Sequence, residues 1–218
     1  FIKALTLILD SFLVICFINH YKQLIMKNLL RIMSVVALVV LLSFSFSKEK
    51  KIVVIDAGHG GNDLGANRNG IYEKEIVLNI AKKIKALNQN QNLEIILTRD
   101  DDTYPSLAQR TGKINELKPN YAISLHVNNS PRQSTEMKGF EVFFQDNESS
   151  KKLANKFSEK FQNSKVKMAN LHILRESKTP TVLLELGFIN NPDERDYLAS
   201  EKGQTETAEK ILSVINEH

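Results

Sequence analysis

The fold of this chain is constrained most strongly by an alternation of short apolar runs with segments of helical periodicity, which begins at residue 51. This alternation predicts βαβ units and therefore a largely parallel sheet. No internal repeat, low-complexity linker or second domain interrupts it before the C-terminus. We therefore expect residues 51–218 to form one α/β domain with a largely parallel, twisted sheet flanked by helices.

The expected elements follow from the period of the apolar residues. Short apolar runs predict strands at 52–55, 93–97, 121–125, 140–144 and 181–184. Helical spacing predicts a helix over 73–87, one capped by Ser106, one carrying Leu153, Phe157 and Phe161, and a closing helical region from Pro192 to Glu217.

The formal charge of +4 belongs to the N-terminal part of the chain. Six of the 29 basic residues and two of the 25 acidic residues lie in residues 1–50, which leaves 23 of each in residues 51–218. Nucleic-acid binding needs a basic patch on the domain itself, so the overall charge does not indicate a nucleic-acid partner. At 42% hydrophobic and 25% charged residues, the composition is that of a folded globular protein.

Residues 26–50 have the layout of a secretory signal peptide. Lys27 and Arg31 precede an apolar run over 32–46, as basic and hydrophobic regions do in such signals. The sequence Phe-Ser-Phe-Ser at 44–47 is a poor cleavage site, so an uncleaved N-terminal anchor is the alternative. Either way we expect export to the periplasm or cell envelope, with membrane contact only through this segment.

Residues 1–25 contain a second apolar run, over 5–18, which Asp10 interrupts. Because this part starts with Phe, we interpret it as upstream read-through, with translation starting at Met26. Two membrane helices are a weaker alternative, since each run is shorter than the ~20 residues of a bilayer span. The single cysteine, Cys16, lies here, so the domain from residue 51 needs no disulfide and cannot use a thiol nucleophile.

Four polar side chains follow the expected strands. His59 lies in IDAGHGG after the first strand, Glu73 opens the next helix, His126 lies in ISLHVNN after the third strand, and Glu185 lies in VLLELGF after the fifth. Ligands bind in open α/β sheets at the carboxyl edge of the strands. Parallel strands would bring all four side chains to this edge.

These four residue types suit a metal-dependent hydrolase. Two histidines and a carboxylate are a recurrent ligand set for catalytic zinc, which lowers the pKa of bound water from 15.7 to about 7. A second glutamate can take a proton from the attacking water and pass it to a leaving nitrogen. Glu185 suits that role, because burial beside Leu184 and Leu186 is expected to raise its pKa.

Each feature alone has another interpretation. The glycines around His59 could form a phosphate-binding loop, although the chain has no GxGxxG motif and no Lys-Ser/Thr pair there. His126 could be a strand-end histidine bonded to backbone, and Glu73 could be a helix N-terminal acid favoured by the dipole. Glu185 is harder to explain, because burying an acid is costly without a partner or a task.

Six segments, taken together, resemble the zinc-dependent N-acetylmuramoyl-L-alanine amidases of the type-3 amidase family. In chain order these segments are IDAGHGGNDLGA, YEKEIVLNIAKKI, LTRDDD, SLAQRTGKIN, ISLHVNNS and PTVLLELGFINN. The resemblance covers nearly all of residues 51–218. It implies an amidase/phosphorylase-like fold and hydrolysis of the amide between the lactyl group of N-acetylmuramic acid and L-alanine in peptidoglycan. Such activity serves cell-wall remodelling, daughter-cell separation or lysis.

The resemblance also implies roles for individual residues. One zinc ion is expected at the positions that match His59, Glu73 and His126, with Glu185 as the catalytic glutamate. Glu75 lies two residues after Glu73, but the family ligand is the acid directly followed by Lys, which selects Glu73.

Four further residues match common family positions. Asn128, Arg99 and Arg110 are expected to contact substrate, and Asn190 matches as well. For the two arginines, a structural salt bridge with an aspartate of 100–102 is an equal alternative.

The chain differs from the cell-division members of the family, which carry an inserted autoinhibitory helix after the second histidine. Here only residues 127–138 separate His126 from Gly139. We therefore expect an accessible site, peptidoglycan as the substrate, no obligate activator and a monomer. The alternative functions are a zinc peptidase that cuts within the stem peptide and a non-catalytic peptidoglycan-binding module.

Overall fold

The computed structural model describes residues 2–44, 49–132, 134–162 and 164–218. These residues form two compact units that divide between Glu49 and Lys50. The expected signal-cleavage sequence falls largely on 45–48, outside the described residues.

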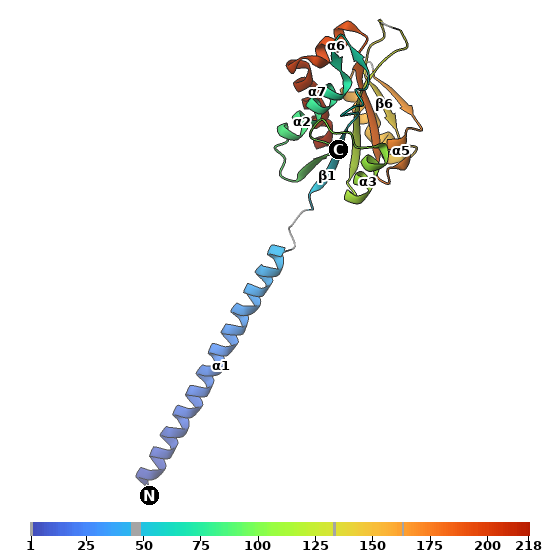
Figure 1. The fold of residues 1–218 in the computed structure, drawn as a ribbon. Coiled ribbons are helices and arrows are strands. Elements are labelled where there is room, and N and C mark those ends of the chain that lie inside the picture. Colours follow the sequence, from blue (N-terminus) through green and yellow to red (C-terminus); the bar gives the residue numbers. More distant parts are fainter. Residues whose placement is uncertain (1, 45–48, 133, 163) are drawn as a thin grey trace. The chain divides into compact units, whose positions relative to one another are not determined.

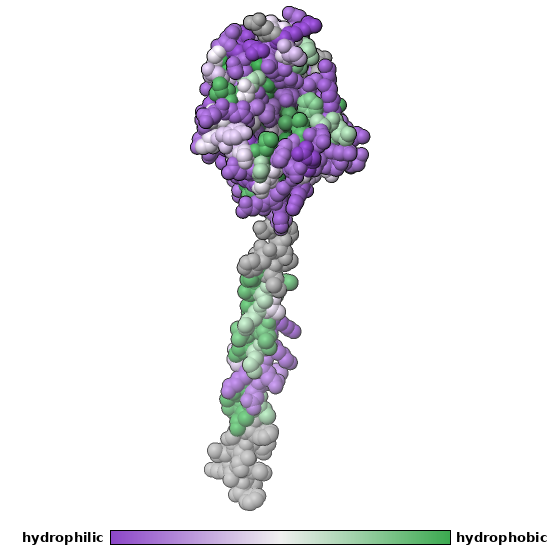
Figure 2. Space-filling model, turned by 45° about the vertical axis from the view of Figure 1, so that its right-hand side comes forward, coloured by the Kyte–Doolittle hydropathy of each residue, from purple (hydrophilic) through white to green (hydrophobic). Residues whose placement is uncertain are grey.

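The N-terminal unit contains one helix, α1 (Ile2–Phe44), of 43 residues. It continues through Asp10 and Met26 without a break, so the described parts of both apolar runs lie on the same helix. Within it, Leu13–Val40 is long and apolar enough to cross a membrane, by length and composition only, and a signal sequence meets the same criterion. Figure 2 shows hydrophobic surface along much of this helix.

The C-terminal unit is built on a six-stranded sheet with the order β4-β1-β5-β8-β6-β7 (Figure 1). Its strands are β1 (Lys51–Ala57), β4 (Leu93–Leu97), β5 (Tyr121–Asn128), β6 (Glu141–Phe144), β7 (Lys165–Met168) and β8 (Thr181–Phe188). Strands β4, β1, β5 and β8 run parallel, whereas β6 is antiparallel to β8 and β7 is parallel to β6. The expected α/β domain with a largely parallel sheet is therefore confirmed.

The helices cover both faces of the sheet. On one face, α2 (Glu73–Leu87), α4 (Glu148–Lys160) and α7 (Glu201–Glu217) pack against the larger hydrophobic core. On the other face, α3 (Leu107–Leu117) and α5 (His172–Glu176) pack against a smaller core. Ser106 caps α3 as expected, because its hydroxyl accepts from the backbone N–H of Gln109.

Some elements differ from the sequence-based expectation. The closing helical region is two helices, α6 (Pro192–Ala199) and α7, because Ser200 is extended and caps α7. The apolar pattern did not predict the short pair β2 (Asn67–Arg68) and β3 (Ile71–Tyr72), nor did it predict α5 and β7. Strand β7 reads Lys-Val-Lys-Met and lies at the sheet edge. Because two of its four residues are lysines, as is common on edge strands, it does not form an apolar run in the sequence.

The polar residues expected just beyond β5 and β8 lie within those strands. His126 is the sixth residue of β5, and Glu185 is the fifth residue of β8. Since side chains alternate along a strand, His126 shares a face with Ser124, and Glu185 shares a face with Leu183. Leu183 belongs to the core under α3 and α5, so the site opens on that face of the sheet.

Candidate active site

The three expected ligands converge on one point. His59 follows β1, Glu73 is the first residue of α2, and His126 lies on β5; their ligand atoms lie within 4.8 Å of one another. Glu73 Oε1 lies 3.1 Å from His59 Nε2 and 2.9 Å from His126 Nδ1. Glu75 is exposed instead. Two imidazole nitrogens and one carboxylate form a donor set that suits a divalent metal such as zinc.

The carboxylate of Glu73 is held on both oxygens. Oε2 accepts a hydrogen bond of 2.8 Å from the backbone N–H of Ala66, and Oε1 accepts one of 3.0 Å from that of Val127. Burial alone would raise the pKa of Glu73, but hydrogen bonds and charge from His126 and His59 lower it far below its ordinary value. Glu73 is therefore an anion, as a metal ligand must be.

His59 has a φ of +58°, in the left-handed region, which costs about 1–2 kcal/mol for a residue with a Cβ. Its Nδ1 lies 2.9 Å from Asp63 Oδ2, which leaves Nε2 facing Glu73. Burial lowers the pKa of His59, but the bonds and charges of Glu73 and Asp63 outweigh this effect and raise it to about 9.

Asp63 is a residue of the site that was not predicted from the sequence. A carboxylate on the second ring nitrogen is a common orienting partner of a metal-binding histidine. The signal was the acidic residue four positions after His59 in HGGND.

Two glycines make room for the ligands. A Cβ on Gly58 would lie 2.4 Å from His126 Cε1, and a Cβ on Gly65 would lie 2.7 Å from both Glu73 Oε2 and His59 Cδ2. The His126 ring thus packs directly on the backbone of Gly58. This close approach accounts for a glycine there without a phosphate-binding loop.

Glu185 lies beside the three ligands. Its residue pairs with His126 across β5 and β8 and with Glu141 across β6 and β8. Its Oε2 is buried and has no hydrogen-bond partner among the described residues. Burial, with smaller contributions from the charges of Glu73 and Glu141, raises the pKa of Glu185 to about 7, in agreement with the expected effect of burial.

Asn128, the asparagine expected to contact substrate, bonds to the carboxylate of Glu141, which pairs with Glu185 across β6 and β8. Its Nδ2 donates a hydrogen bond of 3.1 Å to Glu141 Oε2, and Glu141 Oε1 accepts one of 3.0 Å from Lys167 Nζ. Asn190 is buried and bonds to Ser130, so it braces the loop after β5.

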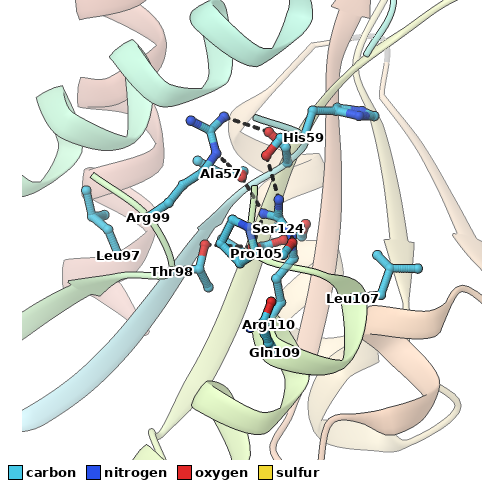
Figure 3. A network of polar contacts seen from close by, with 12 residues as sticks. Ala57, His59, Leu97, Thr98, Arg99, Pro105, Leu107, Gln109, Arg110 and Ser124 are labelled. Carbon is cyan, nitrogen blue, oxygen red and sulfur yellow. Dashed lines mark hydrogen bonds and ion pairs between the residues drawn. The ribbon is translucent and has the colours of Figure 1, made fainter. Parts of the chain in front are cut away.

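The two arginines face the protein interior, and each is only 3% exposed (Figure 3). Arg110 Nη1 pairs with Asp56 Oδ1 at 2.8 Å. Arg99 donates to backbone carbonyls, including that of Ala57. Within the described part of the chain, neither forms an ion pair with an aspartate of 100–102. Their donors are thus occupied by the protein rather than free for a substrate.

A cavity of about 220 Å³ adjoins His59 and His126 on the α3 and α5 face. Its lining includes Tyr104 and Leu107 at the start of α3 and His172 at the start of α5. His172 Nε2 is buried and has no partner among the described residues. The cavity therefore offers mainly apolar surface beside two of the candidate ligands.

Comparison with known proteins identifies a family. The family model described as N-acetylmuramoyl-L-alanine amidase matches residues 53–217. The chain is 33% identical to the N-acetylmuramoyl-L-alanine amidase CwlM of Bacillus licheniformis, covering 68% of this chain and 60% of CwlM. It is 32% identical to the uncharacterized protein YqiI of Bacillus subtilis, covering 78% of this chain and 85% of YqiI. The chain thus spans less than two thirds of CwlM but most of YqiI.

Solved structures share the fold. The catalytic domain of CwlV, an N-acetylmuramoyl-L-alanine amidase from Bacillus (Paenibacillus) polymyxa, is 37% identical, with a TM-score of 0.72. The match covers 77% of this chain and 97% of that domain.

Proposed function

The chain belongs to the N-acetylmuramoyl-L-alanine amidase family, and we propose that it is a zinc-dependent hydrolase of peptidoglycan. Its reaction is hydrolysis of the amide between the lactyl group of N-acetylmuramic acid and L-alanine of the stem peptide. The observation that carries this proposal is the convergence of His59, Glu73 and His126 within 4.8 Å, with the buried carboxyl of Glu185 beside them.

The donor set supports a single zinc ion. His59, Glu73 and His126 would provide three protein ligands, the number that leaves a position open at catalytic zinc sites. A zinc ion bound there supplies Lewis-acid polarisation of the scissile carbonyl and of a water molecule. Asp63 holds the His59 ring through Nδ1, and the backbone N–H groups of Ala66 and Val127 hold the Glu73 carboxylate.

Glu185 is assigned the proton transfers of the reaction. Its carboxylate takes a proton from the attacking water, and its carboxylic acid then donates that proton to the leaving nitrogen of L-alanine. A pKa of about 7 suits both steps, because such a group accepts and releases protons readily near neutral pH. The partnerless Oε2 leaves one carboxyl oxygen available for this exchange.

The surroundings of the site support an extended substrate. The cavity lined by Tyr104, Leu107 and His172 continues from the metal ligands and would hold the groups next to the scissile bond. Residues 129–140 connect β5 to β6, and their described part contains no helix. This supports a site that is accessible without an activator.

We place the enzyme's action at the cell envelope. Peptidoglycan lies outside the cytoplasm, and two observations support export of this chain. Helix α1 contains the apolar segment Leu13–Val40, and the similar protein LytH of Staphylococcus aureus is described as a probable cell wall amidase. Whether the segment is removed or retained as an anchor would be tested by N-terminal sequencing of the exported protein.

Product analysis tests the reaction. The full chain, purified in detergent, would be incubated with peptidoglycan under three conditions. The protein would be untreated, treated with chelator, or treated with chelator and then supplied with zinc. We expect intact stem peptides with a free N-terminal alanine, detected by mass spectrometry, only when metal is present. Fragments cut within the stem would instead identify a peptidase. Binding of peptidoglycan without any soluble product would identify a non-catalytic module.

A further inference from the structure

The backbone carbonyls around His59 are bound by buried cationic side chains. We call residues 57–61, which lead from β1 through His59, the His59 loop. Four of its five carbonyl oxygens accept a hydrogen bond from an arginine or lysine. The fifth, that of Gly60, accepts from the backbone N–H of Asp63. Every carbonyl of the loop is therefore fixed.

Two arginines hold the first three carbonyls. Arg99 donates from Nε to Ala57 O at 2.9 Å and from Nη2 to Gly58 O at 2.7 Å. Arg110 donates from Nη1 to Ala57 O at 2.6 Å and from Nη2 to His59 O at 2.5 Å. The two planar guanidinium groups thus hold the backbone that leads from β1 to His59 (Figure 3). Such forked contacts have a geometry that the single ammonium of lysine cannot reproduce.

The same contacts connect the His59 loop to helix α2. Arg99 Nη2 also donates to Lys74 O at 2.9 Å, next to Glu73 in the chain. In return, Lys74 Nζ donates to Gly61 O at 2.9 Å and to Asp102 Oδ2 at 2.7 Å. One nitrogen of Arg99 therefore joins the backbone that carries the first candidate ligand to the backbone that carries the second.

Arg110 and Lys74 each form an ion pair with an aspartate, whereas Arg99 does not. Arg99 is 3% exposed, and within the described residues no carboxylate oxygen lies within 4.0 Å of its nitrogens. Burying a cation is costly without a charged partner. Arg99 is compensated mainly by backbone carbonyls, and those of the His59 loop are bound in a conformation that includes the left-handed His59. Strained backbone of this kind persists only where its surroundings hold it.

We propose that Arg99, Arg110 and Lys74 are positioning residues, which set the distance between His59 and Glu73 before the metal binds. The inference rests on the proposed metal centre. These side chains donate to backbone carbonyls of the His59 loop rather than to the three candidate ligand side chains. Their role is to keep the metal-free site in the geometry of the occupied one, so that little ordering accompanies metal binding.

The test compares Arg99→Lys with a matched control. The lysine variant keeps the positive charge but loses the forked contacts to Ala57, Gly58 and Lys74. In the control, Lys113→Met, a cation is removed from the carbonyls of Leu97, the last residue of β4, and of Thr98, neither of which is a candidate ligand. Both variants would be prepared as the full chain in detergent.

Three readouts separate positioning from general stability. These are the zinc dissociation constant from chelator competition, the visible spectrum of the cobalt-substituted protein, and the melting temperature of the metal-free protein. We expect Arg99→Lys to weaken zinc binding at least about tenfold, the effect of losing an outer partner of a metal ligand. We also expect it to alter the cobalt spectrum, while Lys113→Met changes neither. Zinc binding within about twofold of the unmodified chain, with an unchanged spectrum, would overturn the proposal.

If Arg99→Lys does not fold, a second variant provides the test. Lys74→Met removes the contact to Gly61 and an ion pair with the exposed Asp102, and the same criteria for zinc affinity and spectrum then decide. The outcome is separable from the proposed function. If the unmodified chain itself bound no zinc, the metal centre would fail. If it bound zinc and the variants bound equally well, only the positioning role would fail.

Discussion

His126 on β5 is the direct cross-strand partner of Glu185 on β8. Both strands are central in the sheet and run parallel, so ladder hydrogen bonds set the separation between a candidate metal ligand and the candidate base. Sites built on strands are held more precisely than sites built on loops. The first ligand, His59, lies on a loop instead, and that loop is the part braced by the arginines.

Replacing Glu185 with Gln should abolish amide hydrolysis and leave zinc binding intact. Gln has nearly the same shape but cannot accept or deliver the proton, and loss of an acid–base group costs roughly 10²–10⁴-fold in rate. The measurement is release of stem peptide by the full chain together with its zinc content. Glu94→Gln, an exposed strand glutamate on β4, is the control and should behave like the unmodified chain. Undiminished turnover in Glu185→Gln would contradict the assignment.

Replacing Gly58 with Ala should weaken metal binding. A Cβ there would lie 2.4 Å from His126 Cε1, so the imidazole ring must move and its nitrogen with it. We expect a loss of at least about tenfold in zinc affinity by chelator competition.

The control for this change is Gly112→Ala on helix α3, where no atom lies within 4 Å of the added Cβ. Removing a helix glycine should raise the free energy of unfolding by up to about 1 kcal/mol and leave zinc affinity unchanged. Equal zinc affinities for the two variants would show that the His126 ring does not need the space at Gly58.

Metal binding should release a proton at neutral pH. The pKa of His59 in the metal-free protein is raised to about 9, so His59 is protonated at pH 7 and must lose its proton to become a ligand. Zinc affinity should therefore rise with pH and level off above about pH 9. Calorimetry in buffers of different ionisation enthalpy would count about one proton released from this residue. An affinity that stayed constant between pH 6.5 and 8.5 would contradict the prediction.

Replacing Asp56 with Asn should destabilise the fold. Asp56 accepts hydrogen bonds from Thr98, Ser124 and Arg110, and Asn would leave the Arg110 cation without its buried partner. Breaking a buried ion pair costs about 3–5 kcal/mol, measured as the free energy of unfolding in denaturant. Asp196→Asn, which removes an exposed pair with Arg195, should change stability by less than about 0.5 kcal/mol.

The pH dependence of this contribution has a definite sign. Burial raises the pKa of Asp56, but Arg110 and the hydroxyl donors lower it below its ordinary value. Its contribution to stability is therefore present above the ordinary pKa of aspartate and is lost as the pH falls toward the lowered value. Asp56→Asn should remove this part of the acid sensitivity. An unchanged acid profile would show that Asp56 does not contribute to it.

The candidate active-site residues could be identified from the sequence because they are characteristic residue types at the carboxyl ends of the expected strands. Hydrophobic periodicity located the strands, and a parallel sheet brings such ends to one edge. His59, Glu73, His126 and Glu185 were found in this way, and the structure brings all four together.

The supporting contacts could not be read in the same way. Nothing in the sequence distinguishes Asp63 and Glu141 from other acidic residues. For Arg99 and Arg110, substrate contact and a structural salt bridge were equal alternatives. Their roles depend on which side chain meets which backbone atom, and this follows from strand order, register and loop conformation. A local pattern of apolar residues does not show which strands are neighbours or which backbone atom a side chain contacts.

The sequence therefore determined the class of fold and the identity of the four central residues, because periodicity and residue type are local properties. The tertiary structure alone decided that β6 and β7 run antiparallel to the other strands, that Glu141 lies opposite Glu185, and that Arg99 joins the His59 loop to helix α2. Those relationships join residues far apart in the chain, and only the packing of the whole sheet brings them within hydrogen-bonding distance.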